Sequence, residues 1–478
     1  MRCVRSTRLS SGVADGNARF QSTKRRVADS TASQDGVHEN PAGDRRERSV
    51  SPGSDTPRGR DVSRWFGGDE PSVRFVAGSL IAGVFFGGVG AGVAFPTLPT
   101  LGPILGISPF LVGLILSTNR FTRLVMNTPA GQVLDRYGTR RPMIAGFVGQ
   151  GLAPFGYVLG LHAAVVPLDS ATVFVLSRAV WGVGSAFVFV GAFSTITHVT
   201  TAANRGKWVG YMRGGQSLGF PAGLVVGGLV TDALGYSEAF LVAGCAGLFA
   251  AAVVALVLPN VRTDVSATSS LREVPKLVRT DVRIFTVGAV NFAVRFLFAG
   301  VLLSTAVLYA GAHDISIGVL SETGVSGVVM AVAVVASSLT TLVVGRYSDR
   351  LSNRAALTLP ALGLLAAGFA LLALVPTLAA TLVAVALVGV GVGGSNPPLL
   401  AYLGDLSPSD DVGKLGGVYN VFGDLGSTLG PLVAVPLVEI VGFRVEYLAC
   451  VGLVLVVGAL VAKTLYGEAA TVPRSELS

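Results

Sequence analysis

Residues 131–141 read GQVLDRYGTRR and residues 345–354 read GRYSDRLSNR, each directly after a long apolar segment. The second stretch is a degenerate copy of the first, 214 positions later (345 − 131). Because the chain has 62 glycines, one such match can arise by chance. The positions that agree are a glycine, an aspartate and two arginines: Gly131, Asp135, Arg136 and Arg140 match Gly345, Asp349, Arg350 and Arg354.

A second pair of segments aligns at its own constant offset of 207 positions (413 − 206). Both pairs occur in the same order along the chain, which indicates two related halves. Repeated halves are typical of secondary transporters, whose substrate site lies near mid-membrane between them. The matched residues are Gly206 with Gly413, Lys207 with Lys414, Gly210 with Gly417, Gly219 with Gly426, Gly223 with Gly430, and Gly235 with Gly442.

The composition is that of a membrane protein. Of 478 residues, 51% are hydrophobic and 13% are charged, and the mean hydropathy is +0.64. Soluble domains carry about 25% charged residues. The three cysteines and four histidines show no ligand spacing, so we expect no metal and no cofactor. The net charge of +8 fits basic loops at a membrane better than a nucleic-acid partner.

Long apolar segments separated by short polar loops begin near Arg74. A helix needs about 20 apolar residues to cross a bilayer, and twelve segments qualify. We therefore expect a polar, disordered arm over 1–72, a six-helix bundle over 73–259, a linker over 260–283, a second bundle over 284–465 and a tail over 466–478. The expected spans are 75–98, 109–129, 142–164, 171–197, 208–230, 237–258, 285–310, 320–344, 355–376, 379–403, 415–438 and 446–463.

The basic residues of the loops predict the orientation. If the chain crosses twelve times, nearly all of them fall on one side, with Arg444 on the other. Cytoplasmic loops carry the excess of Lys and Arg, so we expect both termini in the cytoplasm of a multi-pass plasma-membrane protein. The residues on the basic side are Arg136, Arg140, Arg141, Arg205, Lys207, Arg262, Arg272, Lys276, Arg279, Arg283, Arg346, Arg350 and Arg354.

Several motifs resemble the major facilitator superfamily. The stretch 131–141 is similar to its signature loop between helices two and three. Residues 90–99, 176–184 and 210–228 resemble motifs of its twelve-span drug:proton antiporter branch, although Leu224 stands where the helix-five motif has Pro. The resemblance implies an all-α membrane fold with twelve transmembrane helices in two pseudo-symmetric halves, and secondary active transport by alternating access.

The resemblance also implies roles for two groups of residues. In the family, the loop aspartate, here Asp135, locks a cytoplasmic gate against helix eleven, while glycines bring helix five close to a neighbour. Alternatively, the arginines of the gate loop only fix the membrane topology, and the glycines only pack helices together. The gate loop comprises Gly131, Asp135, Arg136, Gly138, Arg140, Arg141, Gly345, Asp349 and Arg350. The helix-packing motif comprises Gly210, Gly219, Gly223, Gly227, Gly228, Gly426, Gly430 and Pro431.

Charged residues inside the spans are the candidate coupling and cavity groups. A charge at a helix centre costs about 2.5–3.5 kcal/mol, so it usually faces a cavity or a partner. The one deep carboxylate is Asp424 in span eleven, at a depth similar to Arg120 and Arg123 of span two. We therefore predict that Asp424 pairs with one of these arginines. The resemblance implies proton or substrate handling for Arg178, and Arg295 completes the set.

The sequence is compatible with three functions. The first is proton-coupled efflux of small organic molecules, although drug exporters of this branch commonly carry an acid in helix one or four and this chain has none there. The second is import or facilitated passage of a metabolite or organic anion, which the excess of arginine favours. The third is a membrane sensor on the same fold. No enzyme motif is present, and we expect a monomer whose partners are the lipid bilayer, a small-molecule substrate and protons.

Overall fold

A computed structural model describes residues 73–162, 167–201, 204–258, 281–348, 350–351, 353–406 and 412–466, all within one compact unit that spans Asp61–Ser478. The predicted arm over 1–72, most of the predicted linker, nearly all of the predicted tail and Asp349 lie outside these residues. The elements of the first half are α1 (Val73–Val93), α2 (Leu101–Leu105), α3 (Pro109–Tyr137), α4 (Arg140–Leu161), α5 (Ser170–Val199), α6 (Arg205–Leu234) and α7 (Tyr236–Val257).

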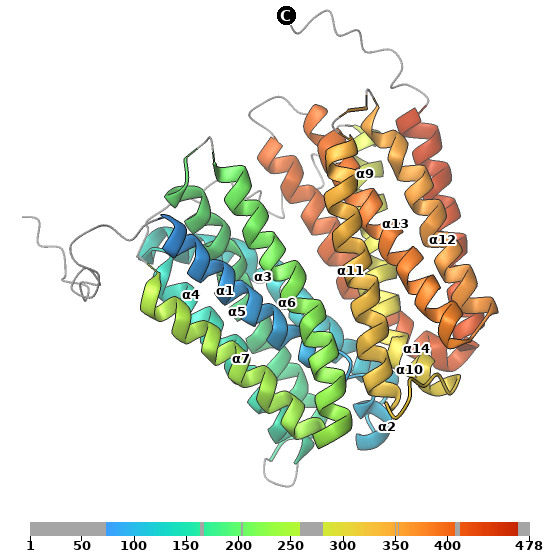
Figure 1. Ribbon diagram of the computed structural model, residues 1–478, viewed down its shortest axis with the longest axis horizontal. Helices are drawn as coiled ribbons and strands as arrows, with labels where there is room; N and C mark the ends of the chain where they lie inside the picture. Colours follow the sequence, from blue (N-terminus) through green and yellow to red (C-terminus); the bar gives the residue numbers. More distant parts are fainter. Residues whose placement is uncertain are drawn as a thin grey trace, which may run out of the picture. The chain divides into compact units, whose positions relative to one another are not determined.

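The second half repeats the plan of the first, and its helices lie together in Figure 1, coloured yellow to red. One of its spans is built from three consecutive pieces, α9, the π-helix η3 and α10. The elements are α9 (Val282–Arg295), η3 (Phe296–Leu302), α10 (Leu303–Ala312), α11 (Glu322–Ser348), η4 (Arg354–Leu357), α12 (Thr358–Leu374), α13 (Leu378–Asp405), α14 (Val412–Val461) and η5 (Ala462–Tyr466).

The described residues contain twelve membrane-spanning helices, as the sequence predicts. Ten segments are long and apolar enough to cross a bilayer. The charged residues of α3 keep it out of that set, although its 29 residues are long enough to span. The long helix α14 holds two spans, because its path breaks at Gly442, where φ is 77°. The matched Gly235 has a φ of 116° between α6 and α7, so both halves turn on a glycine at the same place in the repeat.

The twofold repeat also governs helix packing. A Cβ added at Gly219 of α6 would lie 2.2 Å from the carbonyl oxygen of Phe85, and one at Gly426 of α14 would lie 2.3 Å from that of Phe292. Both the glycines and their partners differ by 207 positions (426 − 219 and 292 − 85). Such close approach requires glycine, which explains why most of the positions that match between the two halves are glycines.

The other glycines of the helix-packing motif behave in three ways. Gly223 and Gly227 continue the contact with α1, against the carbonyl oxygens of Val89 and Val93, and Gly430 packs on η3. Gly228 instead approaches α11 of the other half. Gly210 has no neighbouring atom within 4 Å of an added Cβ, so the packing role predicted for it is wrong. It lies near the start of α6, away from the stretch that contacts α1.

Two span boundaries differ from those expected by five residues or more. The first span ends at Val93 rather than near 98, because the region from Ala94 to Thr100 contains Pro96 and Pro99 and forms turns. In the gate loop, residues 131–137 are helical and belong to the end of α3. The turn itself is confined to Gly138, with a φ of 79°, and Thr139, since α4 already begins at Arg140.

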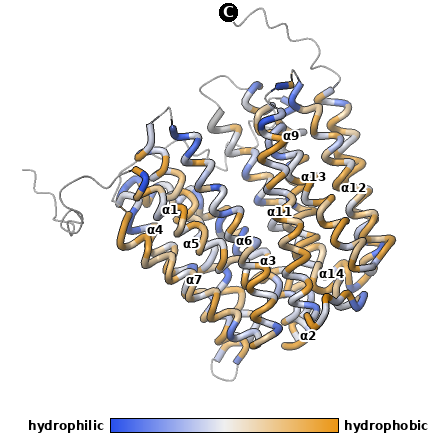
Figure 2. Tube along the Cα trace, in the orientation of Figure 1, coloured by the Kyte–Doolittle hydropathy of each residue, from blue (hydrophilic) through white to orange (hydrophobic). Residues whose placement is uncertain are grey.

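Both halves bury apolar side chains, and Phe95 and Leu224 of the first half join the core of the second. Other apolar side chains point outward. Figure 2 shows hydrophobic residues along most of the length of the helices. Leu256, Ile440 and Val456 are 72%, 79% and 68% exposed. In a soluble protein such exposure is unfavourable, so these faces are the ones that lie against lipid.

Candidate coupling and substrate site

The two halves meet through α3 with α14 and through α6 with α11. In the first pair, Gly113 of α3 approaches the carbonyl oxygen of Pro431, which a Cβ at position 113 would meet at 2.5 Å. In the second, Gly327 of α11 approaches the carbonyl oxygen of Leu224 in the same way, also at 2.5 Å. Small residues thus let helices of different halves approach until their backbones are in contact.

A carboxylate joins the halves at one end of this interface. Asp232, near the end of α6, accepts a hydrogen bond of 2.8 Å from the backbone N–H of Ser321 and another of 3.2 Å from that of Gly324. It also accepts a hydrogen bond from the Ser321 hydroxyl. These donors lie at the start of α11, where unpaired N–H groups attract negative charge. Asp232 therefore caps a helix of the opposite half, and we call this end of the bundles the Asp232 end.

Farther along the same interface, Arg123 of α3 forms an ion pair with Asp424 of α14. Their side chains are 16% and 15% exposed, so water reaches both groups only in part. The Arg123 guanidinium also lies 5.8 Å from the ring centre of Phe189 on α5, a cation–π contact. Of the two arginines that the sequence offered as partners for Asp424, the structure brings Arg123 to it.

Arg120 lies one turn before Arg123 on the same face of α3. It is partly exposed and feels the charges of Arg123, Asp424, Arg295 and Arg178. Among the described residues it forms no hydrogen bond and no ion pair. A charged side chain within a membrane span usually faces the interior of the bundle or a water-filled cavity.

Arg295 approaches the same site from the second half. It is the last residue of α9, directly before the π-helix η3, and π-helical turns are frequent at functional sites. Its side chain is exposed, and its Cγ lies 3.4 Å from a Cβ placed on Gly423, the neighbour of Asp424. Arg295 likewise has no hydrogen-bond or ion-pair partner within the part of the chain that the structure describes.

Neutral polar side chains continue this site within the second half. Asn291 of α9 donates a hydrogen bond of 2.6 Å to the carbonyl oxygen of Tyr419, whose hydroxyl donates to Oδ1 of Asn396 at 2.8 Å. The Oδ1 atom of Asn291 is buried without a partner. Sequence reasoning missed these three residues, because uncharged polar residues in an apolar span give no signal of which way they face.

Arg178 has a different environment from the other arginines. It is 2% exposed, and it donates from Nε to the carbonyl oxygen of Ile115 at 3.2 Å and from Nη2 to that of Leu116 at 3.3 Å and to Oδ1 of Asn119 at 3.2 Å. All three acceptors belong to α3. Arg178 thus fastens α5 to the helix that carries Arg120 and Arg123. The proton or substrate handling implied by the family resemblance stays a prediction.

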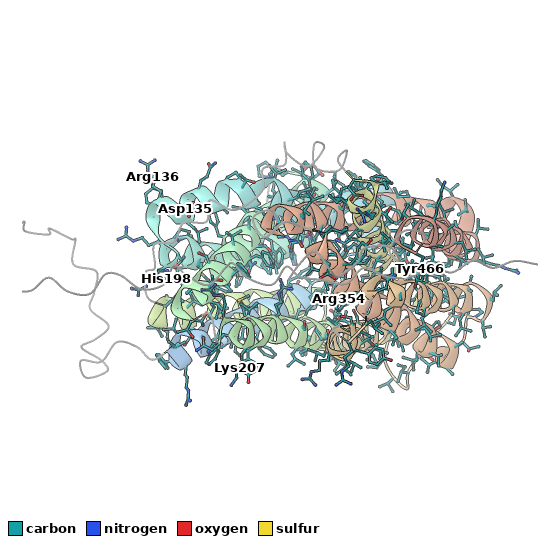
Figure 3. All side chains as sticks on the ribbon, turned by 90° about the horizontal axis from the view of Figure 1, so that it is seen from above. Asp135, Arg136, His198, Lys207, Arg354 and Tyr466 are labelled. Atoms are coloured by element: carbon teal, nitrogen blue, oxygen red, sulfur yellow. The ribbon has the colours of Figure 1, made fainter. Side chains whose placement is uncertain are left out.

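The predicted gate residues lie at the far ends of the helices from the Asp232 end. Arg136 points away from the helices (Figure 3) and stacks on its neighbour Tyr137 at 5.4 Å. Arg140 donates a hydrogen bond of 2.8 Å to the carbonyl oxygen of Ala255 at the end of α7. Gly131 is buried, and Arg141 and Arg350 are exposed. A Cβ added at Gly345 would lie 3.8 Å from the Cβ of Pro397, an ordinary van der Waals distance. The latch between Asp135 and helix eleven stays a prediction.

No group of three or more metal-ligating side chains occurs among the described residues. The sequence analysis did not identify Asp232, although a single acidic residue near the end of an otherwise apolar span could have marked it as a candidate. Glu446, which is 2% exposed with both carboxylate oxygens unpartnered, was missed too.

A two-half bundle of twelve membrane-spanning helices, with charged residues at the interface of the halves, defines a multi-pass membrane transporter. A family model described as Major Facilitator Superfamily matches residues 80–431 and 312–477. The chain belongs to this superfamily, as its motifs predicted.

Named relatives resemble it at low identity. The chain is 23% identical over 359 residues to multidrug resistance protein 2 of Bacillus subtilis, covering 74% of this chain and 86% of that protein. It is 21% identical over 211 residues to the quinolone resistance protein NorA of Staphylococcus aureus, covering 44% and 52%.

Solved structures share the fold. A bacterial homologue of the human lysosomal transporter Spinster, in an inward-facing and occupied conformation, aligns with a TM-score of 0.67 at 15% identity, covering 84% of this chain and 98% of that chain. The human organic anion transporter MFSD10 aligns with a TM-score of 0.57 at 17% identity, covering 82% and 100%.

Proposed function

We propose that this chain is a secondary active transporter that moves a small organic molecule by alternating access and couples the movement to protons through Asp424. The observation that carries the proposal is the ion pair between Arg123 and Asp424, one residue from each half. A carboxylate beside an arginine keeps its charge, while a carboxylate that loses this partner in an apolar region tends to take up a proton. Rocking of the halves would therefore change the proton affinity of Asp424.

The contacts between the halves support alternating access. The cap of Asp232 on α11 and the close contact at Gly228 hold the halves together at the Asp232 end. Hydrogen bonds and small-residue contacts of this kind can break and re-form as two packed bodies rock. We propose that Asp135 forms the corresponding latch at the other end.

Two classes of substrate each have an observation in their favour. The multidrug and quinolone resistance proteins among the relatives support efflux of organic drugs, by exchange for protons. Arg120 and Arg295, which have no hydrogen-bond or ion-pair partner among the described residues, support an organic anion. The human protein with a similar fold is named an organic anion transporter. A sensor on the same fold has no specific observation in its favour.

The direct test is flux in proteoliposomes that contain the full chain, with a pH gradient imposed across the membrane. We expect the gradient to drive accumulation of members of a panel of cationic drugs, sugars and organic anions, and a protonophore to abolish it. A panel that the gradient never drives, measured on protein that is folded and inserted, contradicts the proposal.

For topology, we propose that the basic loops and both termini face the cytoplasm of a plasma-membrane protein. Single cysteines at Ile104 and Ser316, both exposed, should react with an impermeant maleimide added to intact cells. A cysteine at Arg140 should react only after the cells are opened. The background requires Cys3, Cys245 and Cys450 to be replaced by Ser, since Cys245 is exposed. Labelling of position 140 from outside would reverse the orientation.

A further inference from the structure

The site between the halves carries more positive than negative charge. Arg120 and Arg123 come from α3 and Arg295 from α9, while Asp424 is the carboxylate that meets them. Arg123 is paired with Asp424, so Arg120 and Arg295 are left without a partner among the described side chains. Charges inside a membrane usually pair with one another, and two that do not are costly while the site is empty.

These two arginines come from opposite halves. Arg120 feels the charge of Arg295 across the interface, and the repulsion between them falls when an anion lies between them. Guanidinium groups hold carboxylates, sulfonates and phosphates through two parallel hydrogen bonds, so one anion can engage both arginines. A cation would add to the repulsion that already exists there.

We propose, building on the function proposed above, that the substrate is a small organic anion held between Arg120 and Arg295, and that it moves together with a proton on Asp424. The direction of coupling follows from the charges. An anion bound beside Asp424 repels its carboxylate and competes for Arg123, so both effects favour a proton on Asp424. By reciprocity the proton also favours the anion, and the loaded carrier holds both. A cationic substrate would instead displace the proton and give exchange.

The groups that face Asp424 come from few elements. Helix α3 brings Arg120 and Arg123, and α9 brings Arg295 beside Gly423. Tyr419 of α14 interacts with Arg295, and its hydroxyl donates to Asn396. The sequences of α12 and η3 contain no titratable residue. Three other titratable residues of nearby helices have partners elsewhere: Tyr309 of α10 donates to the carbonyl oxygen of Leu372, Asp405 of α13 pairs with Arg354, and Arg178 of α5 is bonded to α3.

The test uses three probes of one shape and different charge in proteoliposomes of the full chain: naphthalene-2-sulfonate, naphthalene-2-sulfonamide and 2-naphthyltrimethylammonium. The sulfonate stays ionised at all working pH values, so it does not leak through lipid as a neutral acid. We expect an outside-acid gradient to drive uptake of the sulfonate, and uptake of the sulfonate to acidify the lumen, reported by trapped pyranine. The ammonium probe should not accumulate under this gradient.

Substitutions then assign the binding groups. Arg120→Gln and Arg295→Gln should each raise the apparent KM for the sulfonate by about tenfold to a hundredfold, the effect expected for loss of one charged hydrogen-bonding partner. Arg120→Lys should recover part of the loss, because charge remains while the planar fork is gone. Arg213→Gln is the matched control, since Arg213 is an exposed arginine of α6 outside this site, and it should leave the KM unchanged.

The outcomes separate the two proposals. Gradient-driven uptake of the ammonium probe, or of other members of the wider panel, without sulfonate uptake overturns the anion assignment and leaves proton-coupled transport standing. Sulfonate uptake driven by an outside-alkaline gradient overturns co-transport in favour of exchange. Unchanged KM values in both glutamine variants remove Arg120 and Arg295 from the site. Absence of any gradient-driven flux contradicts the proposed function itself.

Discussion

Asp424→Asn is expected to lose gradient-driven accumulation while substrate exchange at equal pH continues. Asparagine keeps the shape of the side chain but can neither carry the negative charge that pairs with Arg123 nor take up a proton. The carrier would then bind and release substrate without a proton step. Driven accumulation should fall to the level of protein-free liposomes, and exchange should stay within a few-fold of the unsubstituted protein. Full gradient-driven accumulation in this variant would eliminate Asp424 as the coupling residue.

The partner variant makes the test specific. Arg123→Ala leaves the Asp424 carboxylate without its ion pair, and breaking such a buried pair costs about 3 kcal/mol, or on the order of a hundredfold in an equilibrium. Asp424 should then hold its proton in both conformations, so coupling is lost again. If the two residues act as one unit, the double variant is no worse than either single variant. Additive losses would mean that the residues act independently.

Asp314→Asn provides a matched control for Asp424→Asn. Asp314 is an exposed residue of the loop between α10 and α11, outside the membrane-spanning helices. Its φ is 50°, a conformation that asparagine adopts readily. The control therefore changes the same chemical group without strain, and it should keep both driven flux and exchange. A loss in this variant would show that the assay responds to any lost carboxylate.

The sequence predicted the helices well, because apolar runs of about 20 residues have few alternatives to spanning a membrane. The break in α14 was also predictable, since Gly442 occupies the repeat position of Gly235. The π-helix η3 was not, because its apolar residues also suit an ordinary α-helix. The end of α3 was placed too early, because Asp135 and Arg136 suggested a loop before the helix had ended.

The site was predictable only in part. Depth along the helices placed Asp424 level with Arg120 and Arg123, but the choice between them depends on how each helix is rotated about its axis. Local sequence does not fix that rotation; packing against other helices does. The cap of Asp232 on α11 joins residues about ninety positions apart, so it was visible only in three dimensions.

Arg178→Ala is expected to abolish transport. The substitution removes three hydrogen bonds to α3 from a side chain that is 2% exposed. Hydrogen bonds to charged groups contribute about 1.5–3 kcal/mol each, so α3 would lose its fixed position relative to α5. Because α3 carries both Arg120 and Arg123, Arg178 is a positioning residue for the site. Flux should fall to background, while surface biotinylation shows normal insertion.

Arg178→Lys separates positioning from simple loss of charge. Lysine retains the positive charge but lacks the planar guanidinium that reaches Ile115, Leu116 and Asn119 together, so it should recover less than about a tenth of the flux. A misplaced α3 should also raise the apparent KM and shift the pH profile of the remaining flux, whereas general destabilisation would lower only the amount of active protein. Near-normal flux in Arg178→Ala, or a lysine variant with unchanged KM and pH profile, would remove Arg178 from the transport cycle.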